Sequence, residues 1–230
     1  MSNLFPEIND NLSGTFPEAI DLDSPMQNIG DSSGVNLYLM RHASTDIDDQ
    51  DKAHGWLDEP LNDKGIEESK QIADQLKGVK INQLLTSDLQ RARQTGYFVS
   101  GVTGTHPEPT SDLRPLDLGK YSGMKHSDAH EALNPIYDKW NQDPTSKIPG
   151  GESFKDFQDR NQSVLDRIAS MPEGSNVAVV GHSMTMRLFQ DLIEKGKTEA
   201  GKMLKNVGDE PFMKRFKIKQ STPETVGVRG

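Results

Sequence analysis

The chain has 230 residues, a formal net charge of −9 and a pI near 5.2, which suit one medium-sized domain and exclude a globally basic surface for nucleic acid. Its lack of cysteine excludes disulfides, thiol catalysis and cysteine metal sites. No apolar run approaches the ~20 residues of a membrane-spanning helix, and the N-terminus lacks the basic and apolar regions of a signal peptide. We therefore expect a cytoplasmic protein that binds neither nucleic acid nor a membrane.

Residues 1–33 are acidic and contain neither lysine nor arginine. Such a composition cannot pack a core by itself, so we predict a flexible N-terminal arm. The arm repeats a Phe-Pro-Glu unit, at Phe5–Glu7 and again at Phe16–Glu18. The repeat is either a docking peptide for a protein partner or, the interpretation we favour, chance similarity in a biased segment.

The first predicted strand covers residues 35–41 and ends on Arg41, with His42 directly after it. These residues are poorly suited to ending a buried strand, but together they would hold an imidazole beside a guanidinium that can bind phosphate. The dipeptide alone is weak evidence. An acidic loop follows, and then a predicted helix over 63–77 with apolar residues on one face.

A second strand is predicted over 81–86 and a second helix over 88–99. A cap at Ser87 or the next residue places Arg91 in the first turn of this helix, beside free N–H groups and the positive end of the dipole. The stretch 125–142 is also typical of a helix. It carries His126 and His130 at the spacing of a helical metal pair, but no third ligand is near, so we predict no metal site.

The remaining elements are predicted as a helix over 153–170, a strand over 176–181, a helix over 184–195 and an edge strand over 212–219. Strands that alternate with helices predict an α/β fold with a mostly parallel central sheet. Open sheets of this kind bind ligands at the carboxyl ends of their strands. His182, at the end of strand 176–181, is therefore expected to meet His42 and Arg91 there.

Five segments resemble, in order, the motifs of the histidine phosphatase superfamily, which includes the cofactor-dependent phosphoglycerate mutases. The segments are Arg41–Thr45, Gly55–Leu61 with Gly65, Ser87–Thr95, Pro149–Phe154 with Phe157 and Arg160, and Gly181–His182 with Arg187. The resemblance implies a three-layer α/β/α sandwich over residues 34–220, with a lid-type insertion at 119–150 and a C-terminal tail at 221–230. It also implies a phosphoryl site surrounded by Arg41, His42, Arg91 and His182.

The predicted chemistry of this site is nucleophilic attack by a histidine on phosphorus. Phosphoryl transfer needs an in-line nucleophile and positive charge on the equatorial oxygens. Neighbouring Arg41 and Arg91 disfavour a further cation, so they should hold His42 neutral and ready to attack. The two guanidiniums offer bidentate contacts to phosphate oxygens, and His182 offers a further donor. Neither a metal nor another cofactor is required.

Three further residues are predicted to assist at the site. Thr45 and Ser183 offer hydroxyl groups for phosphate or substrate binding. Glu152 lies within a family motif and is kept as a secondary residue that orients the loop or pocket groups.

One segment departs from the family pattern. The superfamily usually places an acid glutamate in a Leu-x-Glu-x-x-x-Gly segment, and Leu113–Gly119 has Pro115 at that position. Asp117 lies two residues on, and in an extended segment it faces the same side. Asp117 is therefore either the substitute acid, which we slightly favour, or a turn aspartate in an enzyme whose substrates need no acid.

We predict a metal-independent phosphomonoester hydrolase that acts through a phosphohistidine on His42, with a small phosphorylated substrate or a phosphoprotein. A phosphoglycerate mutase-type phosphotransferase is one alternative. The acidic loop argues against it, because its four carboxylates would repel a bisphosphorylated intermediate; they are Asp46, Asp48, Asp49 and Asp51. A weakly active or non-catalytic regulatory protein that binds phosphate esters is the other alternative, and Pro115 is the feature that favours it.

Overall fold

The computed structural model describes residues 34–198, 200 and 213–218. Within them a five-stranded sheet has the order β3-β2-β4-β1-β5. The first four strands are parallel, and the edge strand β5 runs antiparallel to β1. The strands are β1 Val35–Arg41, β2 Gln83–Ser87, β3 Pro107–Thr110, β4 Asn176–Gly181 and β5 Met213–Ile218. The predicted α/β fold with a mostly parallel sheet is confirmed.

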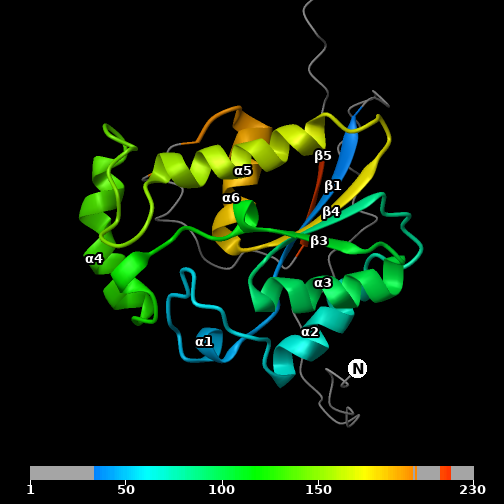
Figure 1. Cartoon of the computed structure of the whole chain (residues 1–230), viewed down its shortest axis with the longest axis horizontal. Coiled ribbons are helices and arrows are strands. Elements are labelled where there is room, and N and C mark those ends of the chain that lie inside the picture. Colours follow the sequence, from blue (N-terminus) through cyan, green and yellow to red (C-terminus); the bar gives the residue numbers. More distant parts are fainter. Residues whose placement is uncertain (1–33, 199, 201–212, 219–230) are drawn as a thin grey trace, which may run out of the picture. The chain divides into compact units, whose positions relative to one another are not determined.

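Helices cover both faces of the sheet (Figure 1). The α-helices are α1 Asp46–Asp49, α2 Asp63–Asp74, α3 Gln90–Thr103, α4 His126–Lys139, α5 Phe154–Ala169 and α6 Ser183–Lys195, with short 3₁₀ turns at Ser111–Leu113 and Gly119–Tyr121. Helices α2 and α3 lie on one face, and α5 and α6 on the other. The three-layer sandwich is therefore also confirmed.

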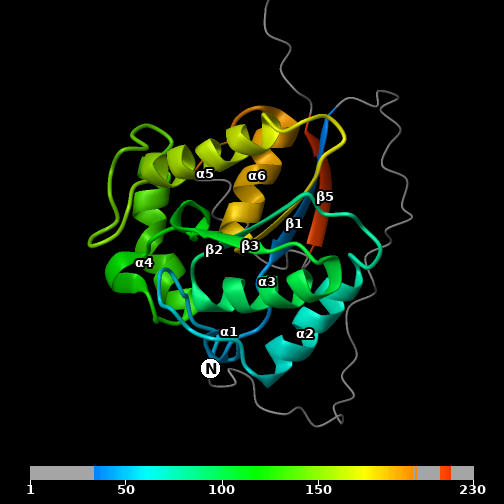
Figure 2. The same ribbon diagram turned by 45° about the vertical axis from the view of Figure 1, so that its right-hand side comes forward.

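The central strands β1 and β4 are mostly apolar, as is typical of parallel strands that are buried on both faces. Leu37 and Leu39 of β1 and Val177 and Val179 of β4 are fully buried, and they pack with residues of α5 and α6 such as Phe189. A second apolar cluster joins α4 to the start of α5. This second cluster holds α4 near the carboxyl ends of the strands, to the left in Figures 1 and 2.

Strand β3 was not predicted from the sequence, because Pro107 and Pro109 interrupt its pattern. Proline cannot donate to a ladder, so it is tolerated mainly at the edge of a sheet. β3 is such an edge strand, paired only with β2. Helix α1 was also missed, because its four acidic-loop residues are too few to show a helical period.

Several predictions concern residues outside the described ranges. The N-terminal arm at 1–33, the tail at 221–230, and residues 212 and 219 of the predicted last strand all lie there. Among the helices that the structure describes, none combines the length and apolarity needed to cross a membrane.

Candidate active site

The two histidines that follow strands lie together because β1 and β4 are neighbours in parallel register. Arg41 pairs with Gly181, and the backbone N–H of His42 donates to the carbonyl oxygen of Gly181 at 2.9 Å. His42 and His182, which directly follow these two paired strands, therefore lie side by side at the same edge of the sheet. The ring centroids of His42 and His182 are 5.0 Å apart, and both side chains are buried.

The hydrogen bond of His42 fixes which ring nitrogen can attack. Its Nδ1 lies 2.8 Å from the carbonyl oxygen of Ala43. A carbonyl oxygen can only accept, so Nδ1 carries the hydrogen and Nε2 keeps its lone pair. Burial lowers the pKa of His42 well below its usual 6.5, and the charges of Arg91 and Arg41 lower it further. At neutral pH the imidazole is therefore neutral, with an unprotonated Nε2.

Arg91 supplies a fixed positive charge from the first turn of α3. Its side chain is fully buried, and it donates to the carbonyl oxygens of Leu57 at 2.6 Å and Gly55 at 3.2 Å. Its Nε has no hydrogen-bond partner within the described ranges. Burial lowers the pKa of Arg91 to about 10, so the guanidinium stays charged at neutral pH and keeps a donor free.

Arg41 is oriented by a carboxylate of the acidic loop. Its Nη2 lies 2.9 Å from Oδ1 of Asp48, while Oδ2 of Asp48 accepts from the hydroxyl of Thr45 at 2.8 Å. Thr45 also caps α1 by accepting from the backbone N–H of Asp48. The Thr45 hydroxyl is buried and engaged within its own loop, and Thr45 is not among the residues that line the cavity. Its phosphate contact stays a prediction.

His54 also lines the cavity, a placement that was not predicted from the sequence. Its ring lies 5.6 Å from that of His42. The Thr45 hydroxyl gives its hydrogen to Asp48, so His54 Nε2 must donate to Thr45 Oγ1, 2.9 Å away. Burial, together with the charge of Arg91, lowers the pKa of His54 to about 4 against the opposing effect of Asp48. The signal in the sequence that could have identified His54 is its position directly before Gly55, where one of the five family-like segments begins.

His182 and Ser183 stand where α6 begins. No side chain caps this helix, so its first N–H groups and the positive end of its dipole are available to an anion. Both ring nitrogens of the buried His182 lack a hydrogen-bond partner among the residues described, and burial, followed by Arg91, lowers its pKa. Ser183 lines the cavity, as does His182. Both residues therefore lie where they could donate to a bound group, and their roles in phosphate binding stay predictions.

The structure does not bring Asp117 into the cavity. Pro115 is among the lining residues and Asp117 is not; the Asp117 carboxylate accepts from the N–H of Gly119 at 2.9 Å. Glu152 accepts from the backbone N–H of Asp117 at 2.8 Å and pairs with Arg160 at 2.6 Å. Glu152 therefore positions the loop behind the cavity wall, and the geometry favours the turn interpretation of Asp117.

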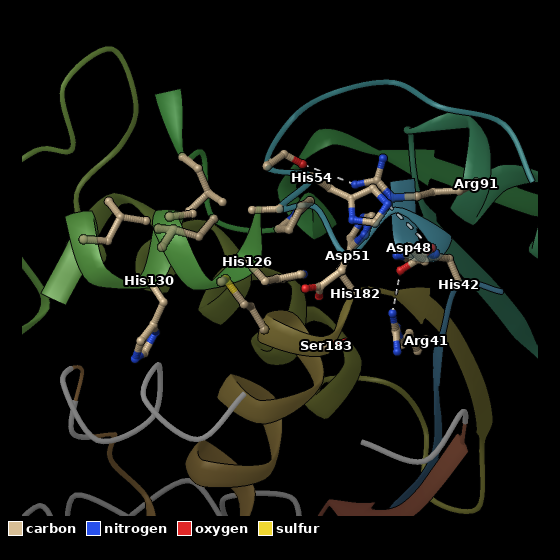
Figure 3. A pocket seen from close by; sticks show the side chains of 18 of the residues that line it. Arg41, His42, Asp48, Asp51, His54, Arg91, His126, His130, His182 and Ser183 are labelled. Atoms are coloured by element: carbon tan, nitrogen blue, oxygen red, sulfur yellow. Dashed lines mark hydrogen bonds and ion pairs between the residues drawn. The ribbon is translucent and has the colours of Figure 1, made fainter. Parts of the chain in front are cut away.

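A cavity of about 640 Å³ is lined by several of the residues described above, namely Arg41, His42, Asp48, His54, Arg91, Pro115, His182 and Ser183. Figure 3 shows Arg41, His42 and Arg91 at one side of it, while His126 and His130 of α4 lie at the other. In the described part of the chain, no group of three or more histidine, aspartate or glutamate side chains is arranged to hold a metal ion. The cavity thus has a cationic inner half with a nucleophile and an outer half formed largely by α4.

Comparison with known proteins points to the same chemistry. The family model of the histidine phosphatase superfamily (branch 1) matches residues 37–216. A probable phosphoglycerate mutase, GpmB, of Cronobacter sakazakii is 29% identical over 157 residues, which cover 66% of this chain and 71% of the relative.

Solved structures give the same arrangement of elements. Mycobacterial glucosyl-3-phosphoglycerate phosphatase is 26% identical with a TM-score of 0.61, covering 74% of this chain and 86% of its own. A phosphoglycerate mutase of Bacillus anthracis is 23% identical with a TM-score of 0.66, covering 82% of this chain and 90% of its own, and shows the shared fold.

Proposed function

Because the chain belongs to the histidine phosphatase superfamily, we propose that it is a metal-independent phosphomonoesterase that forms a phosphohistidine on His42. The observation that carries the proposal is the state of His42. Its Nδ1–H is engaged with a carbonyl oxygen and its Nε2 is free, in a neutral ring close to the charges of Arg41 and Arg91. That arrangement places a nucleophilic nitrogen close to the positive charges that stabilise a phosphoryl group during its transfer.

The reaction proceeds in two displacements at phosphorus. In the first, the lone pair of His42 Nε2 forms the N–P bond, and the P–O bond breaks with its electron pair passing to the leaving oxygen. In the second, water attacks phosphorus of the phosphohistidine and releases one proton to solvent, which balances the proton that the departed oxygen takes up from solvent, and the N–P electron pair returns to Nε2. Arg41, Arg91 and His182 hold the equatorial oxygens through both steps.

Neither residue considered for the family's acid position supplies a proton to the leaving oxygen. Pro115 stands in the cavity wall and has no acid group, and Asp117 lies outside the wall. Substrates with good leaving groups should therefore react fastest, since they need no proton in the transition state.

The proposal is tested by phosphate release from p-nitrophenyl phosphate and a panel of phosphorylated metabolites, in the presence of a chelator. We expect turnover by the wild type and none above background by His42→Ala. The matched control is His106→Ala, which removes an exposed histidine and should leave turnover unchanged. Equal turnover by wild type and His42→Ala would contradict the proposal.

A phosphoglycerate mutase-type transferase is the second candidate, favoured by the name of the Cronobacter relative. A mutase must retain a bisphosphorylated intermediate, for which it needs several cations. Interconversion of phosphoglycerate isomers, primed by 2,3-bisphosphoglycerate and faster than phosphate release, would establish this candidate in place of the hydrolase.

The regulatory alternative, a protein that binds phosphate esters without turning them over, rests on Pro115. Binding of phosphate esters by calorimetry with no turnover in the panel would support it. We keep a small phosphorylated molecule or a phosphoprotein as the proposed substrate and the cytoplasm as the proposed location.

A further inference from the structure

The cavity is larger than one phosphoryl group requires. Its volume of about 640 Å³ lies within the range of roughly 300–1,000 Å³ typical of sites for whole small molecules. Its inner half is occupied by the groups that would hold phosphate. The outer half is therefore the place for the alcohol portion of the substrate, the leaving group.

The outer half is poor in positive charge. The two arginines that line the cavity, Arg41 and Arg91, both belong to the inner half, and no lysine in the described ranges lines it. Apolar side chains form much of the outer wall, namely Leu116, Leu118, Ala129, Leu133 and Met184. The outer half does contain the imidazoles of His126 and His130, but a carboxylate or a second phosphate placed there would lose water without gaining an arginine or a lysine.

Asp51 adds an uncompensated negative charge to this region. Its carboxylate lines the cavity and has no hydrogen-bond or ion-pair partner among the residues that the structure describes. Its backbone is held at φ 52, with its carbonyl oxygen accepting from the first N–H of α4, that of His126, at 2.9 Å. The residue is thus fixed where the acidic loop meets α4.

The other acidic residues of the loop act differently. Asp48 pairs with Arg41, Asp49 accepts from the side-chain amide of Asn62 at 2.8 Å, and Asp46 lies outside the cavity lining. Two of the four carboxylates, those of Asp48 and Asp51, therefore belong to residues that line the cavity, and of these two only Asp48 forms an ion pair within the described ranges.

We propose that this cavity selects phosphomonoesters whose leaving group carries no second negative charge, with Asp51 as the residue that rejects anionic leaving groups. The inference rests on the proposed phosphatase function and names its substrate class. A second anion would meet apolar wall and a like charge, whereas a neutral leaving group would meet neither penalty.

The test uses two substrates of the same shape that differ by one charge, 4-carbamoylphenyl phosphate and 4-carboxyphenyl phosphate. Phosphate release from each is measured with wild type, Asp51→Asn and the matched control Asp46→Asn, an exposed residue of the same loop. We expect wild type to have a kcat/KM about tenfold higher for the carbamoyl substrate. Asp51→Asn should reduce that ratio about three- to tenfold, because one like charge is removed, and Asp46→Asn should leave it unchanged.

Using the ratio of the two substrates cancels any general loss of activity in a variant. Equal kcat/KM values in wild type, a preference for the carboxyl substrate, or a ratio unaffected by Asp51→Asn would overturn the substrate class while leaving the phosphatase function intact. Failure to release phosphate from either substrate or from p-nitrophenyl phosphate would overturn both proposals.

Discussion

At the scale of single residues, the site is defined by polar atoms left without partners. Both nitrogens of His182 and the Nε atoms of Arg41 and Arg91 are buried and unpaired among the described residues. Buried polar groups are normally hydrogen-bonded, because an unpaired group loses its hydration without compensation. Their gathering around His42 is explained most simply by an anionic ligand that completes them.

The free nitrogens of His182 lead to a prediction. His182→Ala should lower kcat by about 10²–10³, the usual effect of removing one donor from a transition-state charge. It should not lower the melting temperature, because the side chain makes no hydrogen bond in the described structure. Steady-state kinetics and thermal unfolding check the two parts. Loss of stability with unchanged kcat would show that His182 serves packing alone.

Asp117→Asn separates the two roles that the sequence left open. The amide oxygen of asparagine can still accept from the N–H of Gly119, as the carboxylate does. We therefore expect kcat for phenyl phosphate and for an alkyl phosphate to fall by the same small factor, if at all. A selective loss on the alkyl phosphate, whose leaving oxygen needs a proton, would restore Asp117 as the acid.

The four central residues were predictable because each lies at a boundary that the sequence marks. Arg41, His42 and His182 follow apolar strands, and Arg91 opens a helix after a strand. His54 and Asp51 were not assigned to the site, because their places depend on how an irregular loop folds onto α4. The orientation of Asp117 also depends on a tertiary contact, the one made by Glu152.

At the scale of elements, close approaches of backbone position the catalytic loop. Gly65 in α2 lies so near the loop after β1 that a Cβ atom there would overlap the carbonyl oxygen of Ser44. Helix α2 can therefore support that loop only with glycine at this place. The packing of α2 on the loop, two residues from His42, is part of what makes the site rigid.

A pair of glycine substitutions tests this contact. Gly65→Ala should lower the free energy of unfolding by about 1–3 kcal/mol through overpacking and lower kcat/KM as the loop shifts. Gly101→Ala is the control, since a Cβ in that part of α3 meets nothing within 4 Å. It should raise stability by about 0.5–1 kcal/mol. Urea unfolding measures both values, and equal effects of the two substitutions would refute the close approach.

Most elements were predictable because apolar periodicity marked them. The strands that flank the site, β1 and β4, match the predicted ranges. β3 and α1 were not predicted, because one contains two prolines and the other has only four residues. The pairing of β4 between β1 and β2 also lies beyond local pattern, since it joins strands far apart in the sequence.

At the scale of the whole molecule, the buried histidines link stability to pH. Burial lowers the folded-state pKa values of His42, His54 and His182. The unfolded chain therefore binds more protons once the pH falls below about 6.5, the ordinary pKa of histidine. Stability from this source is fully present above that pH and is lost as the pH falls.

His54, whose folded-state pKa is about 4, makes this linkage measurable. Between pH 7 and pH 5 it should reduce the free energy of unfolding by about 2 kcal/mol, and His54→Gln should remove that share of the decrease. The exposed His106 provides the control, because His106→Gln should retain the wild-type pH dependence. Urea unfolding at pH 7 and pH 5 measures this change. If His54→Gln lost as much free energy of unfolding between the two pH values as the wild type does, the result would contradict a neutral buried imidazole at His54.

The most direct test of the account is to trap the covalent intermediate. The enzyme is mixed with p-nitrophenyl phosphate, quenched in alkali within the first turnovers, digested and examined by mass spectrometry. The free lone pair of Nε2 predicts a single acid-labile phosphate on that nitrogen of His42, absent from His42→Ala. Phosphate on Nδ1, phosphate on another residue, or turnover with no phosphorylated enzyme would contradict the central claim.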